Sequence, residues 1–282
     1  MQTITLTTLA IFAFAGNSIL CRAAFTHSSI DAASFTSIRL VSGALVLWLL
    51  ARSRRKPHAG AGSWTSAFAL FVCVAGVSFA YVKLSVATGA LLLFGAVQVT
   101  MIGYGIWRGE RLDKLQLLGL VLAFSGLVGL LLPGLSSPPL LGAVLMLTAG
   151  AGWGVYSLRG KDMGDPIWVT ASNFSRAVLF AAILSVMMLG SSSLDNVGFL
   201  YAATAGAITS GIGYVIWYTA LPAISSTTAA TVQLSVPVIT ALGGVAFLSE
   251  TITLRLVAAS IAVISGIAMV IFHKNILRNW YR

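Results

Sequence analysis

The sequence predicts an all-α membrane protein in which ten transmembrane helices form two inverted five-helix repeats, with both termini in the cytoplasm. Hydrophobic residues make up 58% of the 282 residues and charged residues only 9%, whereas a soluble domain is roughly a quarter charged. A bilayer core of about 30 Å requires about 20 apolar residues per helix, and segments of that length follow one another along nearly the whole chain. Little sequence remains for a soluble domain.

Breaks between the apolar segments divide the chain into ten predicted helices. The breaks at Lys83–Gly89 and Tyr218–Ser226 are the shortest, and without either turn the count would fall to nine. The predicted helices span residues 3–25, 32–51, 64–85, 87–108, 114–132, 139–159, 166–189, 196–219, 222–248 and 253–273.

The distribution of basic residues predicts the orientation, because short cytoplasmic loops collect Lys and Arg. An internal N-terminus places 12 of the 17 basic residues on the cytoplasmic side, whereas the loops at 133–138 and 190–196 then lie outside and contain none. Two cytoplasmic termini require an even number of crossings, which favours ten over nine. The twelve residues are Arg52, Arg54, Arg55, Lys56, Arg108, Arg111, Lys114, Arg159, Lys161, Lys274, Arg278 and Arg282.

The net charge of +10 does not indicate a nucleic-acid partner, because the basic residues lie in short connectors and not on a folded soluble face. Cys21 and Cys73 lie within apolar segments, so we interpret them as buried hydrophobic residues and expect neither a disulfide framework nor a metal site. Only Met1 and Gln2 precede the first apolar run, which predicts a retained helix and not a signal peptide.

An internal repeat divides the chain into a first half at residues 1–135 and a second half at 136–282, the latter with a short basic cytoplasmic tail. An offset of 140 residues aligns Glu110 with Glu250 and Ser125-Gly126 with Ser265-Gly266. Slightly shorter offsets align Arg22 with Arg159 and Arg39 with Arg176. An odd number of helices per half inverts the second copy in the membrane, as in many secondary transporters, whose solute site lies between the halves near the midplane.

Several short motifs carry a resemblance to a known family. They are Ala151-Gly152-Trp153-Gly154, Arg39, Arg176, Pro237, Arg108-Gly109-Glu110-Arg111-Leu112 and Leu248-Ser249-Glu250. At these motifs the chain resembles the EamA-type exporters of the drug/metabolite transporter superfamily, which implies five plus five helices and a small-molecule substrate. The segment 88–100 resembles bacterial aromatic amino-acid exporters of that family, which implies export of aromatic or other apolar amino acids, or related metabolites, across the bacterial inner membrane.

The two halves differ where the first has Asn17 and Val97 and the second has Trp153 and Pro237. We therefore expect the halves to contribute unequally to the site.

Polar side chains within apolar segments are candidates for substrate binding, because polar groups in the bilayer are costly. Gln98 shares a helix face with Phe94 and Met101, at spacings of three and four residues, which predicts a cavity wall. The alternative is that Gln98 hydrogen-bonds a neighbouring helix as part of the packing. Asn17, Gln233 and Ser235 are the further polar candidates.

Other candidates each have a structural alternative. Pro237 is either a hinge or a static kink, because proline removes one helical hydrogen bond. Lys83 either attracts a solute carboxylate at the cavity mouth or extends to the lipid headgroups. Arg39 and Arg176 either bind backbone carbonyls or clamp a carboxylate. The aromatic candidates, which either line the cavity or pack in the core, are Phe79, Tyr81, Trp153, Tyr156, Tyr214 and Trp217.

The sequence favours a carrier over an enzyme or a channel. No Asp or Glu lies in the middle of a predicted helix, the three histidines are terminal or in loops, and no GxxxxGK[ST] motif is present. We therefore expect no catalytic residues, no cofactor and no metal, and proton coupling by a buried carboxylate has no candidate residue. Rings of charge or a carbonyl filter would indicate a channel, and neither is found. The oligomeric state stays open between a monomer and a homo-oligomer.

Overall fold

The computed structural model describes residues 2–53, 61–109, 114–132, 137–160, 163–224, 229, 232–233 and 235–280. Its regular elements are all helices within these ranges. They are α1 (Gln2–His27), α2 (Ala32–Ser53), α3 (Trp64–Tyr81), α4 (Val86–Trp107), α5 (Lys114–Leu131), α6 (Leu140–Gly160), α7 (Pro166–Met187), η1 (Leu189–Ser191), α8 (Asn196–Thr204), η2 (Ala205–Ile212), α9 (Gly213–Ala220), η3 (Leu221–Ala223), α11 (Ser235–Leu248) and α12 (Leu254–Trp280).

Seven spans among the described residues are long and apolar enough to cross a membrane, namely α1 to α4, α6, α7 and the continuous run Asn196–Ala223. Three shorter apolar helices, Lys114–Leu130, Ser235–Leu248 and Leu254–Gly266, accompany them. Large apolar side chains such as Phe12, Leu45 and Phe124 are exposed on the outside of the helices, as a lipid environment requires. The fold is an all-helical membrane protein, and the count of ten crossings stays a prediction.

Several helices end at other residues than predicted, because hydropathy does not show where the backbone hydrogen bonds of a helix stop. α3 ends at Tyr81, four residues before its predicted end, so Lys83 lies exposed in the turn before α4. α12 continues to Trp280, past the predicted end at residue 273. The predicted helix at 196–219 contains a π-helical segment, η2. Apolar length sets how much helix the membrane holds, but not where the helix stops.

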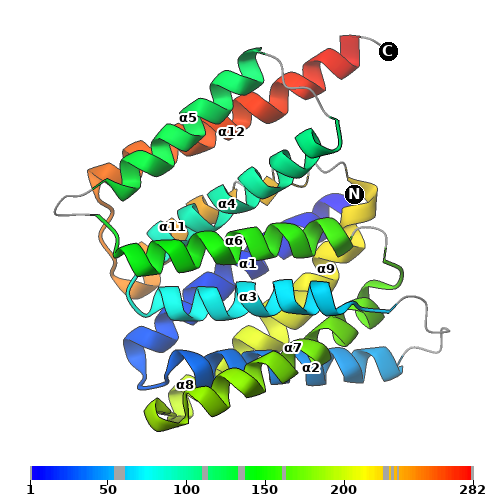
Figure 1. Cartoon of the computed structure of the whole chain (residues 1–282), viewed down its shortest axis with the longest axis vertical. Helices are drawn as coiled ribbons and strands as arrows, with labels where there is room; N and C mark the ends of the chain where they lie inside the picture. Colours follow the sequence, from blue (N-terminus) through cyan, green and yellow to red (C-terminus); the bar gives the residue numbers. More distant parts are fainter. Residues whose placement is uncertain are drawn as a thin grey trace.

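The helices lie roughly side by side (Figure 1). α5 packs on α12 at one edge and α2 packs on α7 at the other. Between these pairs, α6 contacts both α3 and α4, while α1 contacts both α9 and α11. Helices from both predicted halves therefore meet at the centre.

Side-chain caps define the starts of three helices. Ser63 and Ser85 accept hydrogen bonds from backbone amides in the first turns of α3 and α4. Asp165 caps α7, and Pro166 occupies the first position of that helix, where its missing N–H costs nothing. Ser85 thus explains how two helices meet across the short break predicted at Lys83–Gly89.

Two aspartates tie the connection between α1 and α2 to the segment that precedes α8. Asp31 accepts a hydrogen bond from an amide in the first turn of α2 and another from Ser193 N at 2.9 Å. Asp195 accepts one from the first turn of α8 and another from Ser29 N at 3.2 Å. Each carboxylate therefore caps its own helix and also binds the other segment.

Asp31→Ala should destabilise the protein by about 1 kcal/mol at pH 7, the usual value of a helix N-cap. Burial raises the pKa of Asp31, but hydrogen bonds from Ser34, Ser193 and Ala33 outweigh it and hold the pKa below its ordinary value. This stabilisation is complete above the ordinary carboxyl pKa and is lost as the pH falls through the lowered one. Thermal unfolding of the purified protein between pH 3 and pH 7 measures it.

Asp31→Asn is the matched control, because asparagine caps helices about as well as aspartate. It should retain most of the stability at pH 7. Equal unfolding temperatures for wild type and Asp31→Ala across this pH range would contradict the prediction.

Candidate functional site

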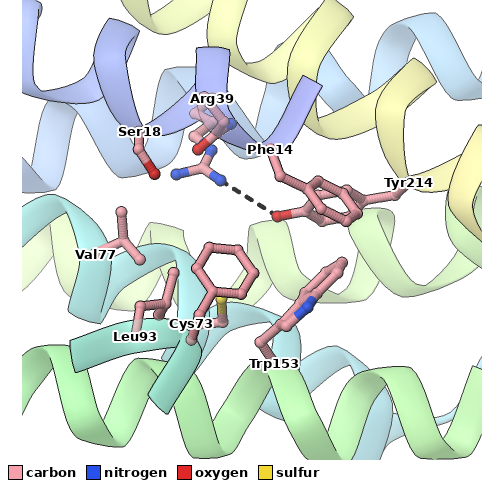
Figure 2. A pocket seen from close by; sticks show the side chains of 10 residues that line it. Phe14, Ser18, Arg39, Cys73, Val77, Leu93, Trp153 and Tyr214 are labelled. Atoms are coloured by element: carbon pink, nitrogen blue, oxygen red, sulfur yellow. Dashed lines mark hydrogen bonds between the residues drawn. The ribbon is translucent and has the colours of Figure 1, made fainter. Parts of the chain in front are cut away.

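A cavity at the centre of the helices, here called the central cavity, has a polar side and an aromatic side (Figure 2). Its free volume is about 30 Å³, room for a few water molecules but far below a typical ligand pocket of roughly 300–1,000 Å³. It must widen to hold a larger solute. Its lining residues are Phe14, Asn17, Ser18, Arg39, Cys73, Val77, Leu93, Phe94, Trp153 and Tyr214.

Arg39 of α2 forms the polar side of the central cavity together with hydroxyl and amide groups. Its Nε donates to Ser210 Oγ at 2.9 Å and its Nη2 donates to Tyr214 Oη at 3.3 Å. Asn17 Nδ2 donates to the same Ser210 hydroxyl and to Thr209 Oγ1, both at 2.9 Å. These bonds hold α1, α2 and the π-helical segment in one network around Arg39, a residue that is only 1% exposed.

The π-helical segment η2 places Thr209 and Ser210 in that network. π-Helical turns are rare and occur frequently at functional sites. The segment reads Ala-Gly-Ala-Ile-Thr-Ser-Gly-Ile, in which small side chains let neighbouring helices approach closely. Ser210, Thr209 and Phe14 are not among the residues predicted from the sequence. The cluster of Gly, Ser and Thr in an otherwise apolar helix is the signal that indicates the first two.

Glycines bring the surrounding backbones into direct contact. A Cβ atom at Gly206 would collide with the Ser42 side chain and with the backbone oxygen of Arg39. A Cβ atom at Gly150 would collide with the backbone oxygen of Leu93, so α6 lies directly against α4. Close contact of α2 with η2 is what lets Arg39 reach Ser210.

Aromatic rings from three helices form the opposite side of the central cavity. The ring centroids of Trp153 and Tyr214 are 4.6 Å apart, and Phe14 lies 5.2 Å from Trp153 at 76° between the ring planes. Trp153 Nε1 donates to Gln233 Oε1 at 3.0 Å. Because its polar atom is engaged elsewhere, Trp153 presents its ring and not its N–H to the cavity.

The structure brings four of the predicted site residues to the central cavity and places three more directly behind its wall. Tyr156 and Trp217 pack against the lining rings, and Gln233 holds Trp153. The four lining residues are Asn17, Phe94, Trp153 and Tyr214.

The other predicted residues lie elsewhere. Gln98 is fully buried and faces α5 beside Ala123 and Leu127, outside the central cavity. Ser235 is exposed and donates to the carbonyl of Val232. Phe79 is half-buried, Met101 is buried on α4, and Tyr81 is buried at the end of α3.

Pro237 is buried in α11, and the described residues 232–233 that precede this helix are also helical. Its role as a hinge stays a prediction.

The two repeat-matched arginines Arg39 and Arg176 have different surroundings. Arg39 lines the central cavity, whereas Arg176 is half-buried beside Trp64, with its Cζ 5.6 Å from that ring centroid. Arg176 Nη1 donates to Ser172 Oγ at 2.7 Å. Their matching positions therefore do not give them the same contacts.

Arginines from the first helix of each predicted half hold the two ends of α3. At one end, Arg22 pairs with Glu250 at 3.0 Å and donates to Tyr81 O at 2.9 Å. Glu250 Oε2 in turn accepts from Val86 N, at the start of α4. At the other end, Arg159 Nε donates to Ser66 Oγ at 3.2 Å. The sequence aligned Arg22 with Arg159, and both hold α3 at its ends.

The groups that line the central cavity are suited to binding a solute. The lining contains one cation, hydroxyl and amide groups, a thiol and aromatic rings. Within the described parts of the chain, no group of three or more His, Cys, Asp or Glu side chains is placed to hold a metal ion. The arrangement suits a small amphipathic solute that contacts Arg39 with a polar group and the rings with an apolar body.

A helical membrane fold with an amphipathic cavity between its central helices defines a membrane transporter. The chain belongs to the EamA-like transporter family, whose model matches residues 140–272, and it is a multi-pass membrane protein. It is 53% identical over 271 residues to the uncharacterized protein PA1977 of Pseudomonas aeruginosa, with 96% of this chain and 94% of the relative covered.

A more distant relative agrees with this family, and a solved structure shares the fold. The threonine/homoserine exporter RhtA of Salmonella typhimurium is 28% identical over 252 residues, with 84% of this chain and 81% of RhtA covered. A crystal structure shares the fold with a TM-score of 0.65 and 17% identity, over 96% of this chain and 99% of the other. The predicted membership in the drug/metabolite transporter superfamily is confirmed.

Gly206→Ala should destabilise the protein by about 1–3 kcal/mol, the usual cost of overpacking, and should weaken solute binding because α2 can no longer lie against η2. Thermal unfolding of the purified protein, with and without a transported solute, measures both effects.

Gly103→Ala on α4 is the control, since no atom lies within 4 Å of a Cβ placed there. It should behave as wild type. A Gly206→Ala protein as stable as Gly103→Ala would show that the contact between α2 and η2 is not close.

Proposed function

We propose that this protein is a secondary transporter that exports amino acids, aromatic or otherwise apolar, or related small metabolites across the bacterial inner membrane by alternating access. The observation that carries the proposal is the central cavity, which combines the cation of Arg39 with the rings of Phe14, Trp153 and Tyr214. The family and the exporter RhtA among its relatives support it. The narrower resemblance to the aromatic amino-acid exporter YddG stays a prediction.

Asn17, Phe94, Trp153 and Tyr214 contact the solute in this proposal, with Tyr156, Trp217 and Gln233 supporting them from behind. Gln98 faces α5, which favours its interpretation as a packing residue. Lys83, exposed in the turn between α3 and α4, is in place to meet the lipid headgroups. The lipid bilayer and a small molecule are thus the partners that this function needs.

The contacts among the helices support the predicted inverted repeat. α6 lies against α3 and α4 of the first half, and α1 lies against α9 and α11 of the second. Each predicted half therefore places its first helix among the third and fourth helices of the other. Rocking of such halves about a shared cavity is the usual form of alternating access.

Two other functions of the same fold are a multidrug or other metabolite exporter and a channel-like facilitator. Purified protein in liposomes, tested with a panel of L-amino acids with and without a pH gradient, separates them. We expect saturable uptake of at least one apolar or hydroxyl amino acid, with counterflow when the same amino acid is trapped inside. Linear, non-saturating flux would make the protein a facilitator, and no amino-acid flux would rule out the proposed substrate.

The arginine contacts at the two ends of α3 act as the gates of the central cavity, one toward each side of the membrane, that alternating access requires. In the predicted orientation, the contact of Arg22 with Glu250 and Tyr81 closes the outer end, and that of Arg159 with Ser66 closes the cytoplasmic end. An ion pair and hydrogen bonds are suited to this role because water replaces them when the helices separate.

Glu250→Gln should open the outer end more often, because the amide keeps the shape of the carboxylate but loses the charge attraction to Arg22. Cys73 lines the central cavity and is 4% exposed, so it reports the opening. In a Cys21→Ala background, a membrane-impermeant maleimide added outside should label Cys73 severalfold faster in Glu250→Gln.

Removal of Cys73 in the same background should abolish the labelling. A labelling rate unchanged by Glu250→Gln would show that the pair of Arg22 and Glu250 does not limit access to the cavity.

A further inference from the structure

The guanidinium of Arg39 has an unused donor at the central cavity. Nε and Nη2 contact the hydroxyls of Ser210 and Tyr214, but Nη1 is buried and has no hydrogen-bond partner. Figure 2 shows the guanidinium turned toward the space between Ser18, Val77 and Tyr214. A buried donor without a partner is costly, so the vacant position calls for an acceptor.

Among the described residues, no acidic side chain lines the central cavity and Arg39 forms no ion pair. In the described part of the chain, Arg22 and Glu250 form an ion pair, which lies at the end of α3 and not at the central cavity. A buried cation with only neutral partners is destabilising unless an anion reaches it. The compensating negative charge is therefore absent from the lining and has to come with the solute.

A purely structural arginine looks different elsewhere in the same protein. Arg255 donates through Nε and Nη2 to the backbone oxygens of Gly129 and Leu132, which join α12 to α5. Arg176 lies against the ring of Trp64 outside the cavity. Among the described residues, Arg39 binds no backbone carbonyl and lies over no aromatic ring, which argues against a role limited to joining helices.

We infer that the central cavity recognises a monocarboxylate through Arg39 and does not accept organic cations. A guanidinium matches the two oxygens of a carboxylate, and its single charge balances one negative charge, which disfavours phosphate with its charge of about −1.5 to −2. The rings of Phe14 and Trp153 contact the apolar body of the same molecule. This inference rests on the proposed function only in that the transported solute enters this cavity.

Binding to the purified protein tests the inference without transport, by ligand-dependent thermal stabilisation at pH 7. The probes are phenylacetate, its neutral analogue phenylacetamide and the cation 2-phenylethylamine, with L-phenylalanine and L-threonine and their carboxamides as a second set. We expect each acid that binds to do so at least tenfold more tightly than its amide, and the amine to give no stabilisation. Equal binding of acid and amide, or binding of no carboxylate in the panel, overturns the inference.

Substitutions assign the preference to Arg39. Arg39→Gln should abolish the difference between acid and amide, and Arg39→Lys should retain part of it. Arg176→Gln is the matched control, because it removes the repeat-related arginine from outside the cavity, and it should keep the full difference. A full difference in folded Arg39→Gln would also overturn the inference.

Tyr214→Phe provides a second route if Arg39→Gln does not fold. It leaves the guanidinium in place and frees Nη2, so the preference for the acid should persist or increase. Loss of the preference in Tyr214→Phe, with the guanidinium intact, would assign carboxylate recognition to the tyrosine and overturn the inference.

The two proposals can fail separately. If Arg39→Gln loses carboxylate binding but the wild-type protein shows no amino-acid flux in liposomes, the inference holds and the proposed substrate is wrong. Amino-acid flux with equal transport of the carboxamides would support the proposed transport function and show that Arg39 does not recognise the carboxylate.

Discussion

The need to hold the charge of Arg39 inside a bundle of apolar helices shapes the centre of this protein. A charged side chain in a membrane helix is costly, and its donors need acceptors. The protein supplies hydroxyls from Ser210 and Tyr214. Ser210 is available because the helix widens into a π-helical turn there, and it is within reach because Gly206 lets α2 lie directly on that turn. Asn17 then joins α1 to the same hydroxyl.

The aromatic side of the cavity depends on a second set of contacts, of which the one between Phe14 and Trp153 joins the two predicted halves. Trp153 of α6 is held by Gln233 and packs against Phe14 of α1 and Tyr214 of α9. The cavity is therefore a property of several helices and not of any one of them. Since the cavity is narrow, a solute larger than a few water molecules requires these helices to move apart. The contacts of Arg22 and Arg159 at the ends of α3 join helices that such a movement would separate.

Much of the fold could be predicted because each signal is local. Apolar length indicated the membrane helices, and caps such as Ser85 and Asp165 explain starts that hydropathy placed within a residue or two. The site was harder. The depth of Trp153 and Tyr214 in apolar helices left cavity lining and core packing as alternatives. Both residues line the central cavity, and their binding of a solute stays a prediction. Gln98 was grouped with Phe94 on one helix face, but the structure turns Phe94 to the cavity and Gln98 to α5. Helical periodicity defines a face; it does not say which neighbour that face meets.

By itself, the sequence determined the class of this protein. Its composition and the length of its apolar segments indicate a lipid environment, and a bilayer accepts apolar helices because their backbone N–H and C=O groups hydrogen-bond within each helix. It also indicated the family through short motifs. Only the tertiary structure decided which of Arg39 and Arg176 lines the central cavity, because the two arginines occupy matching places in the sequence. One lies against hydroxyls brought from residues 210 and 214, and the other lies against Trp64. Those contacts join residues more than a hundred positions apart, and the environment of a buried charge depends on the helices that surround it.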